Sequence, residues 1–166
     1  MRWNGFAAKA VVVAVILAVI GYPAWVKLRP PYVVAVGTPI RHDDFFFTVK
    51  RVTVQRLSDG FTLYHVTINV NNAAKIVNYH WRDDIAYVRA FDDRGFGHDF
   101  FSETRGSFTL AAGDARDAEL AFRLPNGASS PGVYFWDGIY MGDALNGVAY
   151  AKAVVPLADY HPPFGT

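Results

Sequence analysis

Residues 63–72 read Leu-Tyr-His-Val-Thr-Ile-Asn-Val-Asn-Asn, and this stretch decides the fold. Apolar side chains stand at every second position, and they are Tyr64, Val66, Ile68 and Val70. The positions between them carry the polar side chains of His65, Thr67 and Asn69. Because a strand points successive side chains to opposite faces, this alternation predicts a central β-strand with one buried face and one wet face.

The composition restricts the function classes. The 166 residues carry 16 basic and 15 acidic side chains, a formal net charge of +1. The basic residues are scattered, whereas a nucleic-acid groove needs them clustered on one surface, so we expect no nucleic-acid partner. The absence of cysteine excludes disulfides, thiolate metal sites and a lipid-modified cysteine anchor. The 14 glycines, 9 prolines and 16% aromatic content are typical of an all-β domain with many turns.

The N-terminal segment is strongly apolar. Residues 10–26 contain no charged side chain. Since about 20 apolar residues are needed to cross a bilayer as a helix, we interpret residues 10–28 as a transmembrane signal anchor after a short tail of residues 1–9. One alternative is a cleaved signal peptide, for which no small-residue cleavage site follows the apolar run closely. The other is a buried helix of a soluble domain, but residues 11–20 have no polar face.

The expected anchor also predicts a location. Lys27 and Arg29 balance Arg2 and Lys9 across the segment, so the flanking charges do not decide the orientation. A short tail before the span and a folded domain after it favour an N-terminus inside. We therefore expect a single-pass protein of the inner or cytoplasmic membrane, with the C-terminal domain extracytoplasmic, that is, periplasmic or extracellular.

The chain after the anchor has the pattern of short strands separated by turns. We expect a first strand over residues 32–36 and a long strand over residues 45–57. A bulge near residues 50–51 would keep the apolar residues of the long strand on one face. The turn at residues 58–60 predicts a hairpin that joins the long strand to residues 63–72.

The second half continues this pattern. Residues 71–84 are expected to form a long connection with a short strand at residues 76–79. Further strands are expected over residues 85–91, 96–101, 108–110, 118–124, 132–141 and 148–157. Strands and turns without an amphipathic helix predict a β-sandwich over residues 29–157, and residues 158–166 are expected to be a flexible tail.

Several stretches resemble a known family. They are residues 36–37, 47–49, 66–72, 91–95, 110–114 and 119–125, which are similar to the strands and turns of small bacterial immunoglobulin-like domains. Those domains are membrane-anchored or secreted, of unknown function, and related to the mycobacterial immunoprotective secreted antigen. The resemblance implies an all-β, immunoglobulin-like antiparallel β-sandwich of about 7–8 strands at the cell envelope. It implies no activity, because fold alone does not fix function.

The motifs of several enzyme classes are absent. The chain has no Gly-x-Ser-x-Gly elbow, no phosphate loop and no His-Glu-x-x-His sequence. His65 lies on the polar face of the central strand with no identifiable acid or nucleophile beside it, so we interpret it as a solvated side chain. We therefore expect a protein without a cofactor and without enzymatic activity.

Three pairs of aspartates with histidines nearby remain, at residues 42–44, 80–84 and 92–99. Carboxylates from loops at one end of a sandwich suit a hard cation such as calcium, and the candidate ligands are Asp43, Asp83 and Asp92. The alternative is that these aspartates bond to nearby backbone N–H groups in turns. Because each pair lies at an expected strand end, we favour the turn role and expect no metal.

Aromatic residues are the candidates for partner binding. Tyr134 and Trp136 share one face of an expected strand, and Val133 and Phe135 share the other, so one of these pairs lies outside the core. Exposed Trp and Tyr are frequent in binding hot spots. The candidate partner-binding residues are therefore Trp81, Tyr134, Trp136 and Tyr140. The alternative is that these large side chains fill the ends of a small core.

Three functions are compatible with these patterns. We favour a membrane-anchored, non-enzymatic module that binds a protein or another envelope component, whose identity the sequence does not give. The second is a metal-dependent or hydrolytic enzyme built on the aspartate-rich loops. The third is a structural subunit of a membrane complex, in which Ala and Gly residues along the anchor allow close helix packing.

Overall fold

A computed structural model describes Val15, residues 31–135 and residues 153–161. All of these except Val15 belong to one compact unit, Pro31–Gly138 with Tyr150–Thr166. Val15 is helical and belongs to the other unit, Met1–Pro30 with Ile139–Ala149. The predicted anchor, residues 10–28, lies outside the described residues apart from Val15. In the described ranges no helix has the length and apolar character that a membrane span requires.

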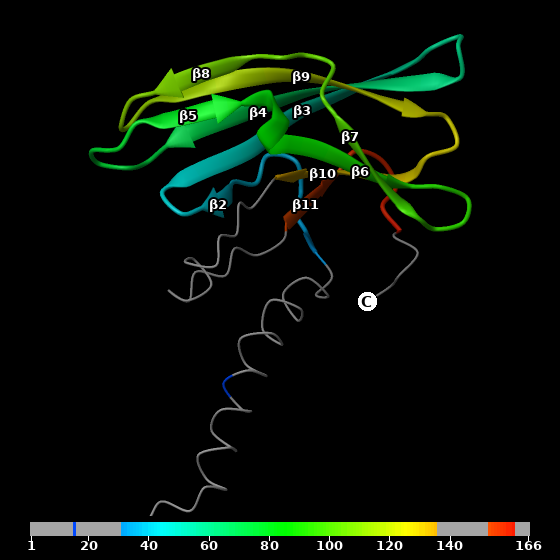
Figure 1. Cartoon of the computed structure of the whole chain (residues 1–166), viewed down its shortest axis with the longest axis horizontal. Coiled ribbons are helices and arrows are strands. Elements are labelled where there is room, and N and C mark those ends of the chain that lie inside the picture. The colour runs from blue at the N-terminus through cyan, green and yellow to red at the C-terminus, as the bar shows by residue number, and fades with distance from the viewer. Residues whose placement is uncertain (1–14, 16–30, 136–152, 162–166) are drawn as a thin grey trace, which may run out of the picture. The chain divides into compact units, whose positions relative to one another are not determined.

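The described fold consists of two main sheets and a short third one (Figure 1). The five-stranded sheet has the order β1 (Tyr32–Val33), β11 (Ala153–Pro156), β10 (Ser129–Phe135), β6 (Ala86–Phe91) and β7 (Gly97–Phe101). The four-stranded sheet has the order β2 (Ile40–His42), β3 (Phe45–Arg56), β4 (Phe61–Asn72) and β9 (Ala115–Pro125). The short sheet pairs β5 (Tyr79–Arg82) with β8 (Ser107–Leu110), and the 3-10 turn η1 (Asp83–Ile85) follows β5.

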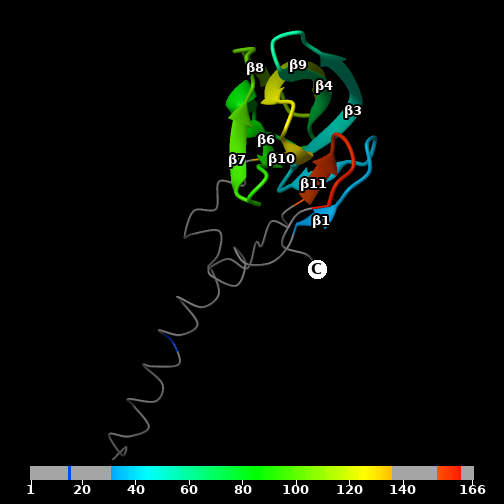
Figure 2. The same ribbon diagram turned by 90° about the vertical axis from the view of Figure 1, so that its right-hand side faces the viewer.

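The two main sheets pack face to face as a sandwich. Figure 2 shows β3, β4 and β9 on one side and β6, β10 and β11 on the other. Alternate residues of both sheets are fully buried in one core, such as Ile68 and Phe122 from the four-stranded sheet and Val88, Val133 and Val155 from the five-stranded sheet. Burial of apolar area between the sheets is the main force that holds such a sandwich together.

The predicted central hairpin is confirmed. Strand β3 pairs with β4 along its whole length, and the register shifts by one residue between Val49 and Arg51, which places the bulge at Lys50. Beyond the bulge, Val52 packs against the core as predicted. Val54, which the bulge was also expected to bring to the core, is 53% exposed, so that part of the prediction is wrong. On β4 the inward side chains of Val66 and Ile68 are 0% exposed, whereas His65 on the other face is exposed.

Other boundaries differ from the predicted ones. The strand expected at residues 76–79 lies at Tyr79–Arg82, and Ile76 is 90% exposed in the loop before it. The pairing partner decides this position, because β5 forms a ladder with β8 in which Trp81 opposes Phe108. The strand expected over residues 32–36 is limited to Tyr32–Val33, where β11 runs beside it.

The side chain of Asn72, at the end of β4, forms hydrogen bonds to several segments. Its side chain is 0% exposed. The amide Nδ2 donates to the carbonyl oxygens of Val77 (2.8 Å), Leu110 (3.2 Å) and Ala111 (3.1 Å), and Oδ1 accepts from the backbone N of Ala74 (3.1 Å). One buried amide therefore holds the β4–β5 loop against the end of β8.

We expect Asn72→Ala to lower the free energy of unfolding by about 3 kcal/mol, because several buried backbone groups would lose their partner. Denaturant unfolding of the purified protein, followed by near-ultraviolet circular dichroism, measures the change. The control is Asn71→Ala, whose side chain lies on the opposite face of β4 and whose loss should cost less than about 0.5 kcal/mol. Equal losses for the two variants would contradict the role given to Asn72.

Candidate functional site

Trp81 lies in the core and not on the surface. Its side chain is 0% exposed, and its ring centroid lies 5.6 Å from that of Phe47. The indole Nε1 donates a hydrogen bond of 2.9 Å to Oδ1 of Asp83, so the polar atom is satisfied without solvent. The prediction that Trp81 contacts a partner is wrong, because β5 turns this side chain inward and Asp83 supplies the acceptor that the indole needs.

Asp83 joins the two strands of the short sheet. Its side chain is buried, and Oδ2 accepts a hydrogen bond of 2.7 Å from the backbone N of Gly106, just before β8. Its other oxygen accepts the Trp81 bond. Both carboxylate oxygens therefore bond to protein donors, which is the turn role rather than the role of a cation ligand.

Asp92 closes the β6–β7 hairpin. Its Oδ1 accepts from the backbone N of Arg94 (3.0 Å) and of Phe96 (2.9 Å), and its Oδ2 lies 2.9 Å from Nε2 of His98. The bond with His98 is the first cause that holds the pKa of Asp92 below its usual value, and the bond from Phe96 is the second. This aspartate also has a turn role.

Asp43 lies in a third turn, between β2 and β3. Its φ of 58° is in the left-handed region, which aspartate tolerates better than most residues. Its backbone carbonyl accepts a hydrogen bond of 2.8 Å from Nε of Arg41. Within residues 31–135 and 153–161, no three or more His, Asp or Glu side chains come close enough together to hold a metal ion. The described chain therefore does not bring the three candidate aspartates into one site.

The outer face of the five-stranded sheet carries one apolar side chain from each strand. The paired residues are Phe101 with Tyr87, Tyr87 with Tyr134, and Val154 with Val33. The pairing of Val133 with Val155 sets Tyr134 opposite Val154. Because directly paired residues point to the same face, these side chains form a row across the whole sheet. We call it the outer row, and it consists of Val33, Val154, Tyr134, Tyr87 and Phe101.

The aromatic part of the outer row is closely packed. The ring centroids of Tyr87 and Tyr134 lie 5.7 Å apart with an interplanar angle of 17°, and those of Tyr87 and Phe101 lie 6.1 Å apart. Phe101 is 60% exposed at the end of the row, on the edge strand β7. The row therefore presents an aromatic surface that solvent reaches from the β7 side.

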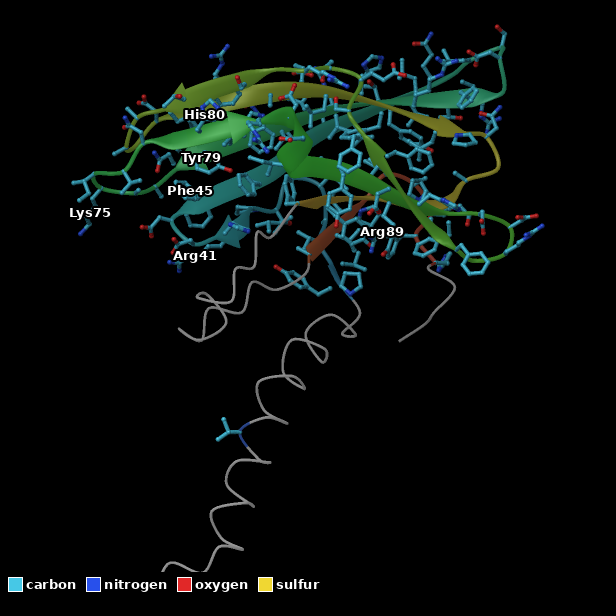
Figure 3. The ribbon with its side chains drawn as sticks, in the orientation of Figure 1. Arg41, Phe45, Lys75, Tyr79, His80 and Arg89 are labelled. Atoms are coloured by element: carbon cyan, nitrogen blue, oxygen red, sulfur yellow. The ribbon has the colours of Figure 1, made fainter. Side chains whose placement is uncertain are left out.

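Arg89 stands beside the outer row on β6, far along the sheets from the end that carries Lys75 and Tyr79 (Figure 3). Its guanidinium carbon lies 5.9 Å from the ring centroid of Tyr87 and 5.8 Å from that of Tyr134. Two hydrogen bonds of 2.6 Å and 2.8 Å join it to the carboxylate of Asp99. This bonding to Asp99 raises the pKa of Arg89, so the cation beside the rings is permanent.

Tyr134 points to the outer face but is only 8% exposed. Its hydroxyl lies 2.6 Å from that of Tyr160, in the segment after β11. Burial and the bond with Tyr160 raise the pKa of Tyr134. Tyr134 and Val133 lie on opposite faces of β10, as the period of a strand predicts. The expectation that Tyr134 is exposed to a partner is wrong for the free chain, because Tyr160 packs beside it. Trp136 and Tyr140 lie outside the described residues.

The outer face of the four-stranded sheet is polar. Lys50 pairs with Asp117 at 2.8 Å, and Thr67 donates to Glu119 at 2.9 Å. Arg123 on β9 pairs with Asp59 in the β3–β4 turn. Exposed pairs of this kind contribute little to stability and are typical of a solvated surface. Among the described residues the two outer faces therefore differ in chemistry. In the outer row the accessible aromatic part is Phe101 with the half-buried Tyr87, whereas Tyr134 and Val154 are buried.

Sequence reasoning missed Arg89, Phe101 and Tyr160. The alternation along residues 86–91 indicates that Tyr87 and Arg89 share a face. Their meeting with Phe101 and Tyr134 depends on the strand order β10-β6-β7, which the local sequence does not carry. Tyr160 follows the last strand in a segment without periodicity, so no pattern indicates its contact.

The comparisons with known proteins identify no family. No family model matches the chain, and no curated protein matches it. An uncharacterized β-sandwich protein from Clostridium difficile 630 is similar over 78% of this chain and 97% of its own, with 11% identity and a TM-score of 0.49. A DUF1425 family member from Shewanella sp. pv-4 is similar over 68% of this chain and 99% of its own, with 16% identity and a TM-score of 0.36.

We expect millimolar calcium to shift the melting temperature of the protein by less than about 1 °C, because Asp83 and Asp92 already bond to protein donors. Differential scanning fluorimetry with calcium or with a chelator measures the shift. A saturable rise with calcium that is lost in Asp92→Asn would contradict this expectation and favour a metal site.

Proposed function

We propose that this chain is a non-enzymatic binding module and that a protein or another envelope component contacts the outer row. The observation that carries the proposal is the packed set of Tyr87, Tyr134 and Phe101 beside the Arg89 cation. Aromatic and arginine side chains are the types enriched at binding hot spots. On the four-stranded sheet Arg123 lies over a single ring, that of Phe61, at 4.5 Å.

Binding is favoured over catalysis for a chemical reason. A hydrolytic or metal-dependent site needs carboxylates or a nucleophile free to act on a substrate. In the described chain, Asp83 and Asp92 accept bonds that hold strands and turns together. The sequence also has no Gly-x-Ser-x-Gly elbow, phosphate loop or His-Glu-x-x-His motif. The enzyme and the structural subunit remain the alternative functions.

We infer an immunoglobulin-like connectivity for the sandwich. Two pairings support it: β9 returns to the four-stranded sheet beside β4, and β10 returns to the five-stranded sheet beside β6. The chain therefore crosses repeatedly between the two sheets, as in an immunoglobulin-like sandwich. The parallel pairing of β1 with β11 at the sheet edge is a second support. We also propose that the chain is related to the family of the mycobacterial immunoprotective secreted antigen, which its strands and turns resemble.

We further propose that residues 10–28 anchor the module in an inner or cytoplasmic membrane with the sandwich outside. The support is the uncharged run of residues 10–26. We expect protease added to spheroplasts to digest the sandwich while the membrane is intact. Immunoblotting for a C-terminal tag measures this, with a cytoplasmic protein as the control. A sandwich protected until the membrane is lysed would contradict the extracytoplasmic location.

We expect Phe101→Ser to reduce recovery of the partner by about 5-fold or more without unfolding the protein, since this side chain is 60% exposed on the outer row. In-cell crosslinking and pull-down of the full-length protein measure the recovery. The matched control is Val54→Ser, a 53% exposed apolar residue of the four-stranded sheet, which should leave recovery unchanged. Equal recovery from both variants would place the contact elsewhere.

A further inference from the structure

The segment after β11 folds back over the outer face of β10. The backbone N of Leu157 donates to the carbonyl of Pro131 at 2.9 Å, and the backbone N of His161 donates to the hydroxyl of Ser130 at 2.8 Å. Between these bonds, the Tyr160 hydroxyl lies 2.6 Å from that of Tyr134. Residues 157–161 are therefore held against β10 at three points.

Gly132 provides the space for the Tyr160 ring. A Cβ atom on Gly132 would lie 3.1 Å from Cε2 and 3.5 Å from Cδ2 of Tyr160, and 2.4 Å from a methyl carbon of Val154. The ring therefore rests on the backbone of β10, where any other residue would place a side chain. This gap lies beside the outer row, two residues before Tyr134 on β10, with the methyl carbon of Val154 on one side and Arg89, which pairs with Gly132 across the ladder, on the other.

The backbone of β10 is irregular at Ser130, the residue that bonds to this segment. Its φ is 48°, a left-handed conformation that is rare for serine. The register with β6 shifts between Ser129 and Gly132, so β10 has one extra residue here, as in a β-bulge. The side chain of Ser130 is buried, and its hydroxyl accepts the bond from His161. An unfavourable backbone conformation of this kind persists where the contacts of the surrounding residues hold it in place.

We propose that the gap over Gly132 is a binding site for an aromatic side chain, that Tyr160 fills it in the free chain, and that the partner fills it with an aromatic side chain of its own. The occupant is a peptide segment that carries tyrosine, because Tyr160 is the group already seated there. This inference rests on the proposed function and names the chemistry that its contact face recognises. Tyr160 then acts as a tethered competitor.

The contacts of Tyr160 suit an exchangeable occupant. One hydroxyl bond and one ring face hold the side chain, and the ring is only partly buried. A tethered group competes at an effective concentration in the millimolar range, so a partner with more contacts displaces it. Arg89 and Tyr134 remain beside the vacated gap to receive the new ring, and Phe101 extends the surface toward β7.

The first experiment tests the site itself with p-cresol, the side-chain analogue of tyrosine, on the full-length protein. Tyr160→Ala empties the gap and leaves the core untouched. We expect p-cresol to shift the amide resonances of Ser130, Gly132 and Tyr134 saturably in this variant, with an apparent affinity at least about 10-fold higher than in the parent. Toluene should bind more weakly, because it lacks the hydroxyl that bonds to Tyr134.

Two controls keep this result decisive. Tyr32→Ala truncates a 49% exposed tyrosine of β1 and should behave as the parent does. Deletion of residues 159–166 removes the same ring by another route and replaces Tyr160→Ala if that variant unfolds. A folded chain without Tyr160 that gives no saturable shifts at the three amides would overturn the proposal.

The second experiment tests the use of the site by a partner. Pull-down as above should recover at least about 3-fold more partner with Tyr160→Ala than with the parent, because the competitor is gone. Recovery unchanged by Tyr160→Ala, although p-cresol binds, would overturn the claim that the partner uses this gap. Absence of any partner for all variants would refute the proposed function, and the p-cresol shifts would then decide the site on their own.

Discussion

The buried amide of Asn72 is the constraint on which the arrangement of the strands depends. Strand β4 is the centre of the four-stranded sheet, and its last residue bonds to the β4–β5 loop and to the end of β8. The backbone of Asn72 also accepts from the N of Gly113 and donates to the carbonyl of Asp114, which fixes the turn into β9. A buried amide is costly unless all its partners are in place, so this residue selects one register for three segments. Burial of apolar side chains alone would be compatible with several registers.

The sequence carried the central hairpin and the strand β9, because their information is local. The alternation over residues 63–72 and 118–124 indicates which side chains face the core. The shift in the apolar alternation of β3 near Lys50 indicates the position of the bulge. The position of β5 is not local information. Tyr79–Arg82 become a strand because Trp81 can reach the core and β8 is there to pair with them, whereas Ile76 and Val77 stay exposed although they are better strand formers.

The candidate site was predictable only in part, for the same reason. The opposite faces of Val133 and Tyr134 follow from the period of a strand, and the structure agrees. Burial depends on what covers a face. Trp81 is enclosed because Asp83 satisfies its indole, and Tyr134 is covered by Tyr160 from a segment that has no period of its own. The register that brings Arg89 to both tyrosines also joins strands that are distant in the chain.

The geometry of β10 argues that its outer face is shaped for contact. On the core side, this strand presents Val133, which pairs with Val155, and Phe135, and a regular strand would present them equally well. The extra residue before Gly132, the left-handed Ser130 and the missing side chain at Gly132 are all unfavourable in a strand that serves the core alone. Each of them has a use on the outer face, where Ser130 accepts the His161 bond and Gly132 admits the ring of Tyr160. Local strain without a role in the core is therefore explained by what lies on that face.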